Sequence, residues 1–218
     1  MTARRPAYQA PPRGTKRRTG TRAARERTLA ALHRQIRACT RCPLWHTRLN
    51  AVPGAGPADA AVMIVGEAPG RQEDAQGQPF VGAAGRVLVD LLTEAGLRRE
   101  EVYITNVVKS HPTDRKGGSN RAPRRDEVAA CLPWLQQQLS IIRPRLIVTL
   151  GTHALRAFLP GKKITQVHGR PFQHDGLTVL PLYHPAVALY GVRKEILRRD
   201  MQEVRQVLAA ARERRSRV

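Results

Sequence analysis

The sequence is poor in aromatic residues, in acidic residues and in cysteine. Phe, Trp and Tyr make up 4% of its 218 residues, and 17 acidic residues stand against 38 basic ones. Three cysteines, an odd number, argue against a disulfide framework. No apolar run approaches the roughly 20 residues of a membrane-spanning helix, and residues 1–27 lack the hydrophobic segment of a secretory signal. We therefore expect a cytoplasmic protein with no membrane partner.

The excess of basic residues is concentrated at the two ends of the chain. The formal net charge is +21; residues 1–37 carry 11 basic residues and one acidic residue, and residues 193–218 carry nine and four. Basic ends around a milder middle predict a polyanionic partner, nucleic acid before a membrane surface. A genome that favours Arg codons would raise the same count, so charge alone leaves this interpretation open.

Three segments are predicted along the chain. Residues 1–26 mix Pro and Gly with Arg and Lys and show no apolar periodicity, which predicts a disordered basic N-terminal arm. Residues 27–213 are predicted to form one domain, since a chain of this length buries one substantial core. Residues 214–218 are predicted to be a short basic tail.

Strand patterns and helix patterns alternate through the central domain. Short apolar runs predict buried strands at residues 61–65, 102–108, 146–150 and 177–182. Apolar residues at helical spacing predict helices at residues 27–38, 87–95, 126–142, 151–158 and 193–213. This order predicts an α/β fold with a central parallel sheet flanked by helices on both faces. Ligands of such sheets bind at the carboxyl ends of the strands.

The segment after the first predicted strand holds several candidate functional residues. Gly66, Ala68 and Gly70 would let backbone N–H groups approach a ligand closely. Glu67 could orient water or stabilise a positive charge, and Phe80 offers a flat face for a base. Helix capping by Glu67 and core packing of Phe80 are the structural alternatives.

The second and fourth predicted strands end in Asn106 and His184. An Asn amide has one acceptor and two donors and can therefore read the edge of a pyrimidine. A histidine after a strand can donate a hydrogen bond to a developing anion. Asn106 alone is as well explained by backbone hydrogen bonding at the strand end, and a lone histidine such as His184 is more often structural. Polar groups at the ends of three strands favour a shared site.

Three cysteines are a further candidate constellation. Cys39 and Cys42 form a CxxC pair before the domain core, and Cys131 lies on the predicted helix 126–142. A CxxC pair alone is weak, whereas a CxxC pair with two more well-spaced cysteines would indicate a metal or cluster site. Only one further cysteine exists.

Taken in series, these motifs resemble family 4 uracil-DNA glycosylases, the iron–sulfur branch of the uracil-DNA glycosylase superfamily. The resemblance covers residues 36–208 and rests on Gly66-Glu-Ala-Pro-Gly70, Glu73-Asp74, Gly77-x-Pro-Phe-Val-Gly82, Ala84-Gly85, Thr105-Asn-Val-Val-Lys109, Glu127-Val-Ala-Ala-Cys131, Pro144-Arg-Leu-Ile-Val-Thr-Leu-Gly151 and His184-Pro185. It implies a base-excision-repair enzyme that flips uracil out of DNA and hydrolyses its N-glycosidic bond. The implied partner is uracil-containing DNA, bound by a monomer associated with the nucleoid.

The resemblance also implies a role for each candidate residue. Phe80 would stack on uracil, and Asn106 would donate to its O4 and accept from its N3–H. His184 would stabilise the uracil anion through O2, and Glu67 would position water or balance the sugar cation. Residues that would line the pocket without a reactive group are Gly66, Ala68 and Gly70.

A 4Fe-4S cluster is implied as well, with one departure from the family pattern. Its ligands would be Cys39, Cys42 and Cys131, but the position of the fourth cysteine is Ser110, followed by His111. Serine is a harder and far less acidic ligand than a cysteine thiolate, and clusters are normally held by four cysteines. The alternatives are a cluster with Ser110 or His111 as its fourth ligand, a three-iron cluster, zinc, or no metal.

Two other functions remain open at the level of sequence. The fold could act on hypoxanthine, a mismatched base or a DNA–protein crosslink, or it could be a non-catalytic DNA-binding homologue without a cluster. Glu67, Phe80, Asn106 and His184 together favour an active uracil-DNA glycosylase, while the missing fourth cysteine favours the non-catalytic alternative. A nucleotidase is disfavoured because the chain has no P-loop pattern.

Overall fold

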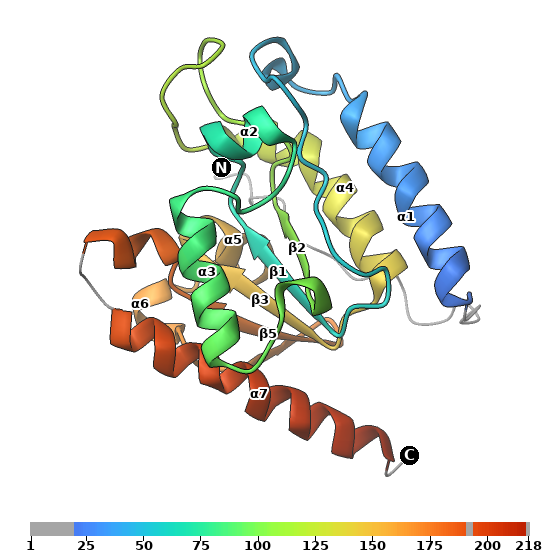
Figure 1. The fold of residues 1–218 in the computed structure, drawn as a ribbon, viewed down its shortest axis with the longest axis vertical. Helices are drawn as coiled ribbons and strands as arrows, with labels where there is room; N and C mark the ends of the chain where they lie inside the picture. Colours follow the sequence, from blue (N-terminus) through green and yellow to red (C-terminus); the bar gives the residue numbers. More distant parts are fainter. Residues whose placement is uncertain (1–19, 191–193, 217–218) are drawn as a thin grey trace.

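The computed structural model describes residues 20–190 and 194–216. Five strands form a single sheet in the order β2-β1-β3-β5-β4 (Figure 1). The strands are β1 (Val62–Gly66), β2 (Tyr103–Asn106), β3 (Leu146–Leu150), β4 (Phe172–His174) and β5 (Leu177–Leu182). Four of them are parallel, and β4 pairs antiparallel with β5.

Helices connect the strands and cover both faces of the sheet (Figure 1). The α-helices are α1 (Arg22–Arg37), α2 (Arg71–Gln76), α3 (Ala83–Glu94), α4 (Arg125–Ile142), α5 (Gly151–Phe158), α6 (Ile164–Val167) and α7 (Lys194–Ser216). Short 3-10 helices are η1 (Pro43–His46), η2 (Arg99–Glu101) and η3 (Pro185–Tyr190).

Strand β1 explains why the apolar runs of this sequence are continuous. Met63 and Val65 pack on the face covered by α1, α4 and α5, whereas Val62 and Ile64 pack on the face covered by α3 and α7. Successive side chains of a strand point to opposite faces. A strand buried on both faces therefore needs apolar residues throughout.

The predicted fold class is confirmed. One predicted strand is shorter than expected, and one further strand was not predicted. The strand predicted at residues 102–108 ends at Asn106. It ends there because the N–H groups of Val107 and Val108 donate to the carbonyls of Gly66 and Glu67, in the loop after β1. Strand β4 was not predicted, because its three residues are only partly buried and carry no apolar run.

The predicted limits of the terminal segments also shift. Helix α1 begins at Arg22, inside the predicted arm, because Thr21 Oγ1 caps it by accepting from the Ala24 N–H at 3.2 Å. The rest of that arm, residues 1–19, lies outside the described residues. Helix α7 continues to Ser216, into the predicted tail. Across residues 20–190 and 194–216, no helix has the length and apolarity needed to cross a membrane.

The strand order places a switch point between β1 and β3. From β1 the chain moves through α3 to β2 on one side, and from β3 it moves through α5 to β5 on the other. The loops at the carboxyl ends of these two strands therefore diverge and leave a crevice between them. The polar residues predicted at strand ends surround this crevice.

Candidate active site

A pocket of about 680 Å³ opens at the carboxyl ends of the parallel strands. Its walls come from the segments after β1 and β5, from the end of β2 and the loop that follows it, and from the start of α5. Six residues predicted from the sequence line it together: Glu67, Ala68, Gly70, Phe80, Asn106 and His184. The parallel topology thus brings together side chains that are up to 117 residues apart in sequence.

Gly66 lies beneath this pocket and does not line it. A Cβ atom at this position would come within 2.3 Å of Asn106 Oδ1 and 2.7 Å of Phe80 Cζ. Any other residue would therefore displace one of these two side chains. Gly66 is needed for the close packing of the amide and the aromatic ring.

Asn106 ends β2 opposite Gly66 and is 1% exposed. Its Oδ1 has no hydrogen-bond partner among the described residues. A buried acceptor without a donor costs roughly 1–3 kcal/mol. Such a cost is retained where a ligand supplies the donor, so this amide oxygen marks the pocket as a polar recognition site.

A buried lysine fixes the backbone at the same strand end. Lys109 Nζ donates to Thr105 Oγ1 at 2.8 Å, to Gln138 Oε1 at 2.7 Å and to the Asn106 carbonyl at 2.5 Å. All three acceptors are neutral, and burial lowers the pKa of Lys109 to about 7. The three bonds hold the backbone from which the Asn106 side chain projects.

His184 follows β5, and its ring is held in one tautomer. The Ala186 N–H donates to His184 Nδ1 at 3.2 Å, so the neutral ring carries its proton on Nε2. Burial lowers the pKa of His184, which favours this neutral form, and the nearby charge of Glu73 opposes the shift. The His184 and Phe80 ring centroids are 5.9 Å apart. His184 is thus suited to donate one hydrogen bond into the pocket.

Glu67 is the carboxylate of the pocket and stays partly solvated. Its side chain is 31% exposed, and its Oε1 lies 3.8 Å from His153 Nε2 at the start of α5. Burial raises the pKa of Glu67, and the positive charge of Arg156 opposes this. His153 was not predicted; its position just after a parallel strand was the available signal.

Two further groups of residues line the pocket for which the sequence predicted no site role, although Glu73 belongs to one of the family motifs. Asn120 and Arg121 line the pocket from the long loop between β2 and α4. Arg121 is fixed there by Glu127 through two hydrogen bonds of 2.9 and 2.7 Å. Glu73 lines the pocket from α2. Its place three residues after Gly70 was a recognisable helix-start signal, because a Glu there bonds the backbone of the cap residue.

The three cysteines are free thiols where α1 and η1 meet α4. A hydrogen bond between Cys42 and Cys131 lowers the pKa of the Cys42 thiol to about 7 and raises that of Cys131. Cys39 Sγ accepts a hydrogen bond of 3.3 Å from Trp134 Nε1. In the parts of the chain that are described, no three His, Cys, Asp or Glu side chains form a group that could hold a metal ion.

At the fourth position of the predicted cluster site, the hydroxyl of Ser110 already accepts a hydrogen bond. Arg48 Nη1 donates to Ser110 Oγ at 3.1 Å, and Arg48 Nη2 donates to the Cys39 carbonyl at 2.8 Å. His111 Nε2 lies 2.6 Å from Asn120 Oδ1, whereas its buried Nδ1 has no hydrogen-bond partner among the described residues and lies 3.9 Å from Asp74 Oδ2. The residues therefore do not fit a four-thiolate cluster. A metal-binding role for the three thiols stays a prediction.

Comparisons with known proteins agree with this geometry. The family model described as the uracil DNA glycosylase superfamily matches residues 53–209. A type-4 uracil-DNA glycosylase of Sulfurisphaera tokodaii is 41% identical over 191 residues, which cover 83% of this chain and 84% of the relative. Type-4 enzymes of Thermotoga maritima and Pyrobaculum aerophilum are 43% and 45% identical, covering 83% and 80% of this chain and 93% and 90% of their own.

A type-5 uracil-DNA glycosylase of Thermus thermophilus is more distant, at 32% identity over 70% of this chain and 72% of its own. The type-4 enzymes match this chain at higher identity and over a larger share of its length. Residues 53–209, which the family model matches, include all five strands. The chain belongs to the uracil-DNA glycosylase superfamily, in its type-4 branch.

Proposed function

We propose that this chain excises uracil from DNA by hydrolysing the bond between uracil N1 and the sugar C1′. The observation that carries the proposal is the unpaired, buried oxygen of Asn106 in the wall of the pocket. The N3–H of uracil supplies the donor that this oxygen lacks. The names of the three relatives at 41–45% identity, which are type-4 uracil-DNA glycosylases, support the same reaction.

The amide of Asn106 and the ring of Phe80 recognise the base. Asn106 accepts from uracil N3–H and donates to O4, while cytosine presents an acceptor and a donor at these two positions in the opposite order. Each buried mismatch of this kind costs roughly 1–3 kcal/mol. Phe80, 7% exposed beneath the pocket, stacks on the flipped base.

His184 and Glu67 stabilise the charges that develop in the reaction. As the N1–C1′ bond breaks, its electron pair leaves with uracil, and His184 Nε2–H donates to the anion at O2. The sugar becomes cation-like, and the Glu67 carboxylate stabilises it and orients the water that adds to C1′. The water proton balances the uracil anion, so the products are uracil and an abasic site.

The DNA substrate must present its base outside the stack, because the pocket admits a base and not a duplex. Base flipping costs a few kcal/mol, and contacts with the phosphates offset it. A monomer acting on chromosomal DNA in the cytoplasm stays a prediction.

Incubation with a labelled oligonucleotide that contains one uracil, followed by alkaline cleavage, tests the proposal. We expect cleavage at uracil and none in matched strands with cytosine, thymine or hypoxanthine. His184→Asn should lower single-turnover excision by roughly 10²–10³-fold, the cost of losing one anion-stabilising donor. The exposed His46→Asn is the matched control and should be unchanged. Cleavage of the hypoxanthine strand in place of the uracil strand would favour the alternative substrate.

A further inference from the structure

The backbone of Phe80 has a conformation that its residue type does not favour. Its φ angle is +52°, in the left-handed region, where bulky side chains are rare. Such a residue persists only when its surroundings hold it in place. The ring of Phe80 lies under the base pocket, so this conformation sets where the stacking face stands.

Arg99 holds the backbone carbonyls around Phe80. This arginine belongs to none of the sequence motifs described above. Arg99 Nη1 donates to the Phe80 carbonyl at 3.0 Å, and Arg99 Nη2 donates to the Pro79 carbonyl. The planar guanidinium fork can reach two adjacent carbonyls at once, which an ammonium group cannot reproduce. Arg99 lies on η2, 19 residues after Phe80.

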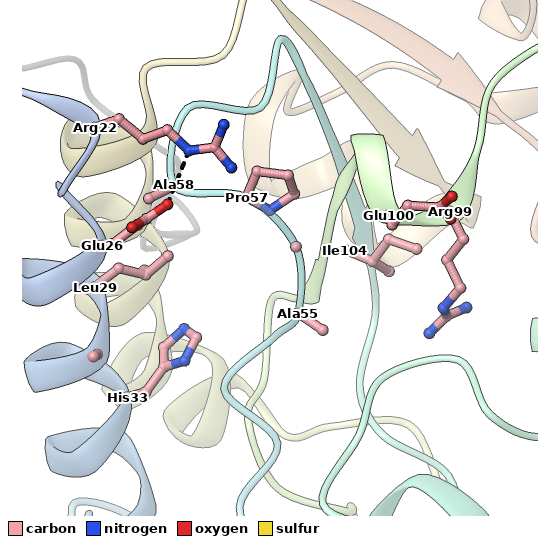
Figure 2. A pocket seen from close by; sticks show the side chains of 12 residues that line it. Arg22, Glu26, Leu29, His33, Ala55, Pro57, Ala58, Arg99, Glu100 and Ile104 are labelled. Carbon is pink, nitrogen blue, oxygen red and sulfur yellow. Dashed lines mark hydrogen bonds and ion pairs between the residues drawn. The ribbon is translucent and has the colours of Figure 1, made fainter.

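Arg99 is also at the edge of a second cavity, and it does not direct its charge there. This cavity, about 540 Å³, lies between α1, the segment 55–58 and η2. Figure 2 shows the guanidinium of Arg99 directed away from Arg22 and Glu26, the charged pair on the α1 side. The side chain therefore spans from this cavity to the Phe80 segment.

The N–H side of the segment is held by Glu73. Its Oε1 accepts from the N–H groups of Val81 at 3.0 Å and Gly82 at 2.8 Å, and its Oε2 accepts from Gly70 at 3.1 Å. Burial lowers the pKa of Arg99, and the charge of Glu73 opposes this, as expected for neighbouring opposite charges. Phe80 is thus held between a guanidinium that bonds the carbonyls of Pro79 and Phe80 and a carboxylate that bonds the next two N–H groups.

Close packing from α3 limits the segment further. A Cβ atom on Gly85 would lie 2.0 Å from the Phe80 carbonyl oxygen, so α3 contacts the segment through bare backbone. The carbonyl that Arg99 bonds is the same one that Gly85 contacts. Without the guanidinium, this partly buried carbonyl loses its donor.

We propose that Arg99 is a positioning residue for uracil excision, which acts through Phe80 by holding its backbone in the left-handed conformation together with Glu73. The inference rests on the proposed function, because it assigns the stacking role to Phe80. Arg99 itself does not touch the base pocket. Its effect on the reaction is therefore confined to what the ring of Phe80 contributes.

A double-mutant cycle between Arg99 and Phe80 tests this. Arg99→Met keeps the length of the side chain and removes its donors; it should lower kcat/KM for a uracil oligonucleotide by about 5- to 150-fold, no more than Phe80→Ala does. In the Phe80→Ala background, Arg99→Met should lower kcat/KM by less than about twofold. Arg99→Lys should recover part of the loss, since it restores one donor. The exposed neighbour Arg98→Met is the matched control and should be unchanged in both backgrounds.

Hydrogen exchange of the peptide that contains Val81 and Gly82 gives a second, activity-independent reading. We expect faster exchange in Arg99→Met and Arg99→Lys and wild-type exchange in Arg98→Met. Equal losses of kcat/KM in both Phe80 backgrounds, or unchanged exchange in Arg99→Met, would overturn the proposal. If Arg99→Met does not fold, Arg99→Lys carries the same cycle. A wild-type protein that leaves uracil in place would instead refute the proposed function, and the exchange experiment would still decide whether Arg99 holds the segment.

Discussion

Asn106 combines two properties that we expect of a residue that recognises a base. It is almost fully buried, and its amide oxygen is unpaired within the described part of the chain. Removing such a side chain removes an unfavourable desolvation cost in the free protein. The same removal deprives bound uracil of its polar partners.

We therefore expect Asn106→Ala to lower kcat/KM at least about 30-fold, since two base contacts of roughly 1–3 kcal/mol each are lost. The melting temperature should stay within about 3 °C of the wild type. Asn106→Asp should also lose uracil activity and gain poor cytosine activity at most, because a carboxylate has no donor for O4. Excision kinetics and thermal melts measure both effects. The exposed amide variant Gln137→Ala is the control, and wild-type turnover in Asn106→Ala would refute the assignment.

We expect His184 to make the reaction sensitive to acid. Burial lowers its pKa below the ordinary value of about 6.5, and its Nδ1 already accepts the Ala186 N–H. Protonation at Nδ1 would break that bond, so the active neutral ring is complete above about pH 6.5 and is lost as pH falls through the lower folded pKa.

Glu67, whose pKa burial raises, also titrates on the acid side. Glu67→Gln removes that titration, so the remaining acid limb of its kcat/KM profile reports His184. We expect the midpoint of this limb below about pH 6.5. A midpoint above that value would mean that the ring is stabilised in its charged form in the folded protein.

At the scale of elements, the sequence was informative where burial is continuous and uninformative where short polar segments act. The runs in β1, β3 and β5 could be predicted because strands buried on both faces need apolar residues throughout. Helix α2 has a start signal in Glu73, three residues after Gly70, but its extent could not be predicted, since its six residues, Arg71–Gln76, have no apolar periodicity. Arg99 could not be assigned either, because its partners lie about 20 residues away in sequence and no local pattern links them.

The contact of α1 and η1 with α4 gives the prediction for the metal site. Three thiols meet there, but Arg48 bonds the hydroxyl of Ser110 at the fourth position. Ser110→Cys supplies the missing thiolate, and we expect anaerobically reconstituted protein to approach about four iron atoms per chain. Its melting temperature should rise, because a metal that binds the folded state alone stabilises that state.

Iron analysis, the visible absorption spectrum and thermal melts measure these changes. Ser140→Cys, at an exposed position of the same helix α4, controls for iron bound by a stray thiol. We expect the wild-type protein to hold any cluster less firmly than Ser110→Cys. A colourless, iron-free Ser110→Cys protein would show that the three thiols are not the remainder of a cluster site.

At the scale of the whole molecule, the residues that form the pocket and most of the excess basic residues lie in different parts of the sequence. The match to the superfamily covers residues 53–209, while the net charge of +21 is concentrated toward the two ends. On the proposed function, we expect the pocket to select a base through shape and hydrogen bonds, and basic residues outside it to bind phosphates without reading sequence. Substrate choice and DNA affinity should therefore be separable by mutation.

Residues 1–19 hold six basic residues and no acidic one, and they precede the capped start of α1 at Thr21. Removing them keeps that cap and should lower the affinity for duplex DNA at low salt. Each lost phosphate contact reduces the slope of log affinity against log salt by about 0.9, so the whole change should not exceed about 5. Single-turnover excision at saturating DNA should be nearly unchanged, because the pocket is intact. A full-length variant with these six residues changed to Gln separates charge from chain length and should behave like the truncation. Equal salt slopes for the wild type and both variants would instead mean that this segment contributes solubility and no DNA contact.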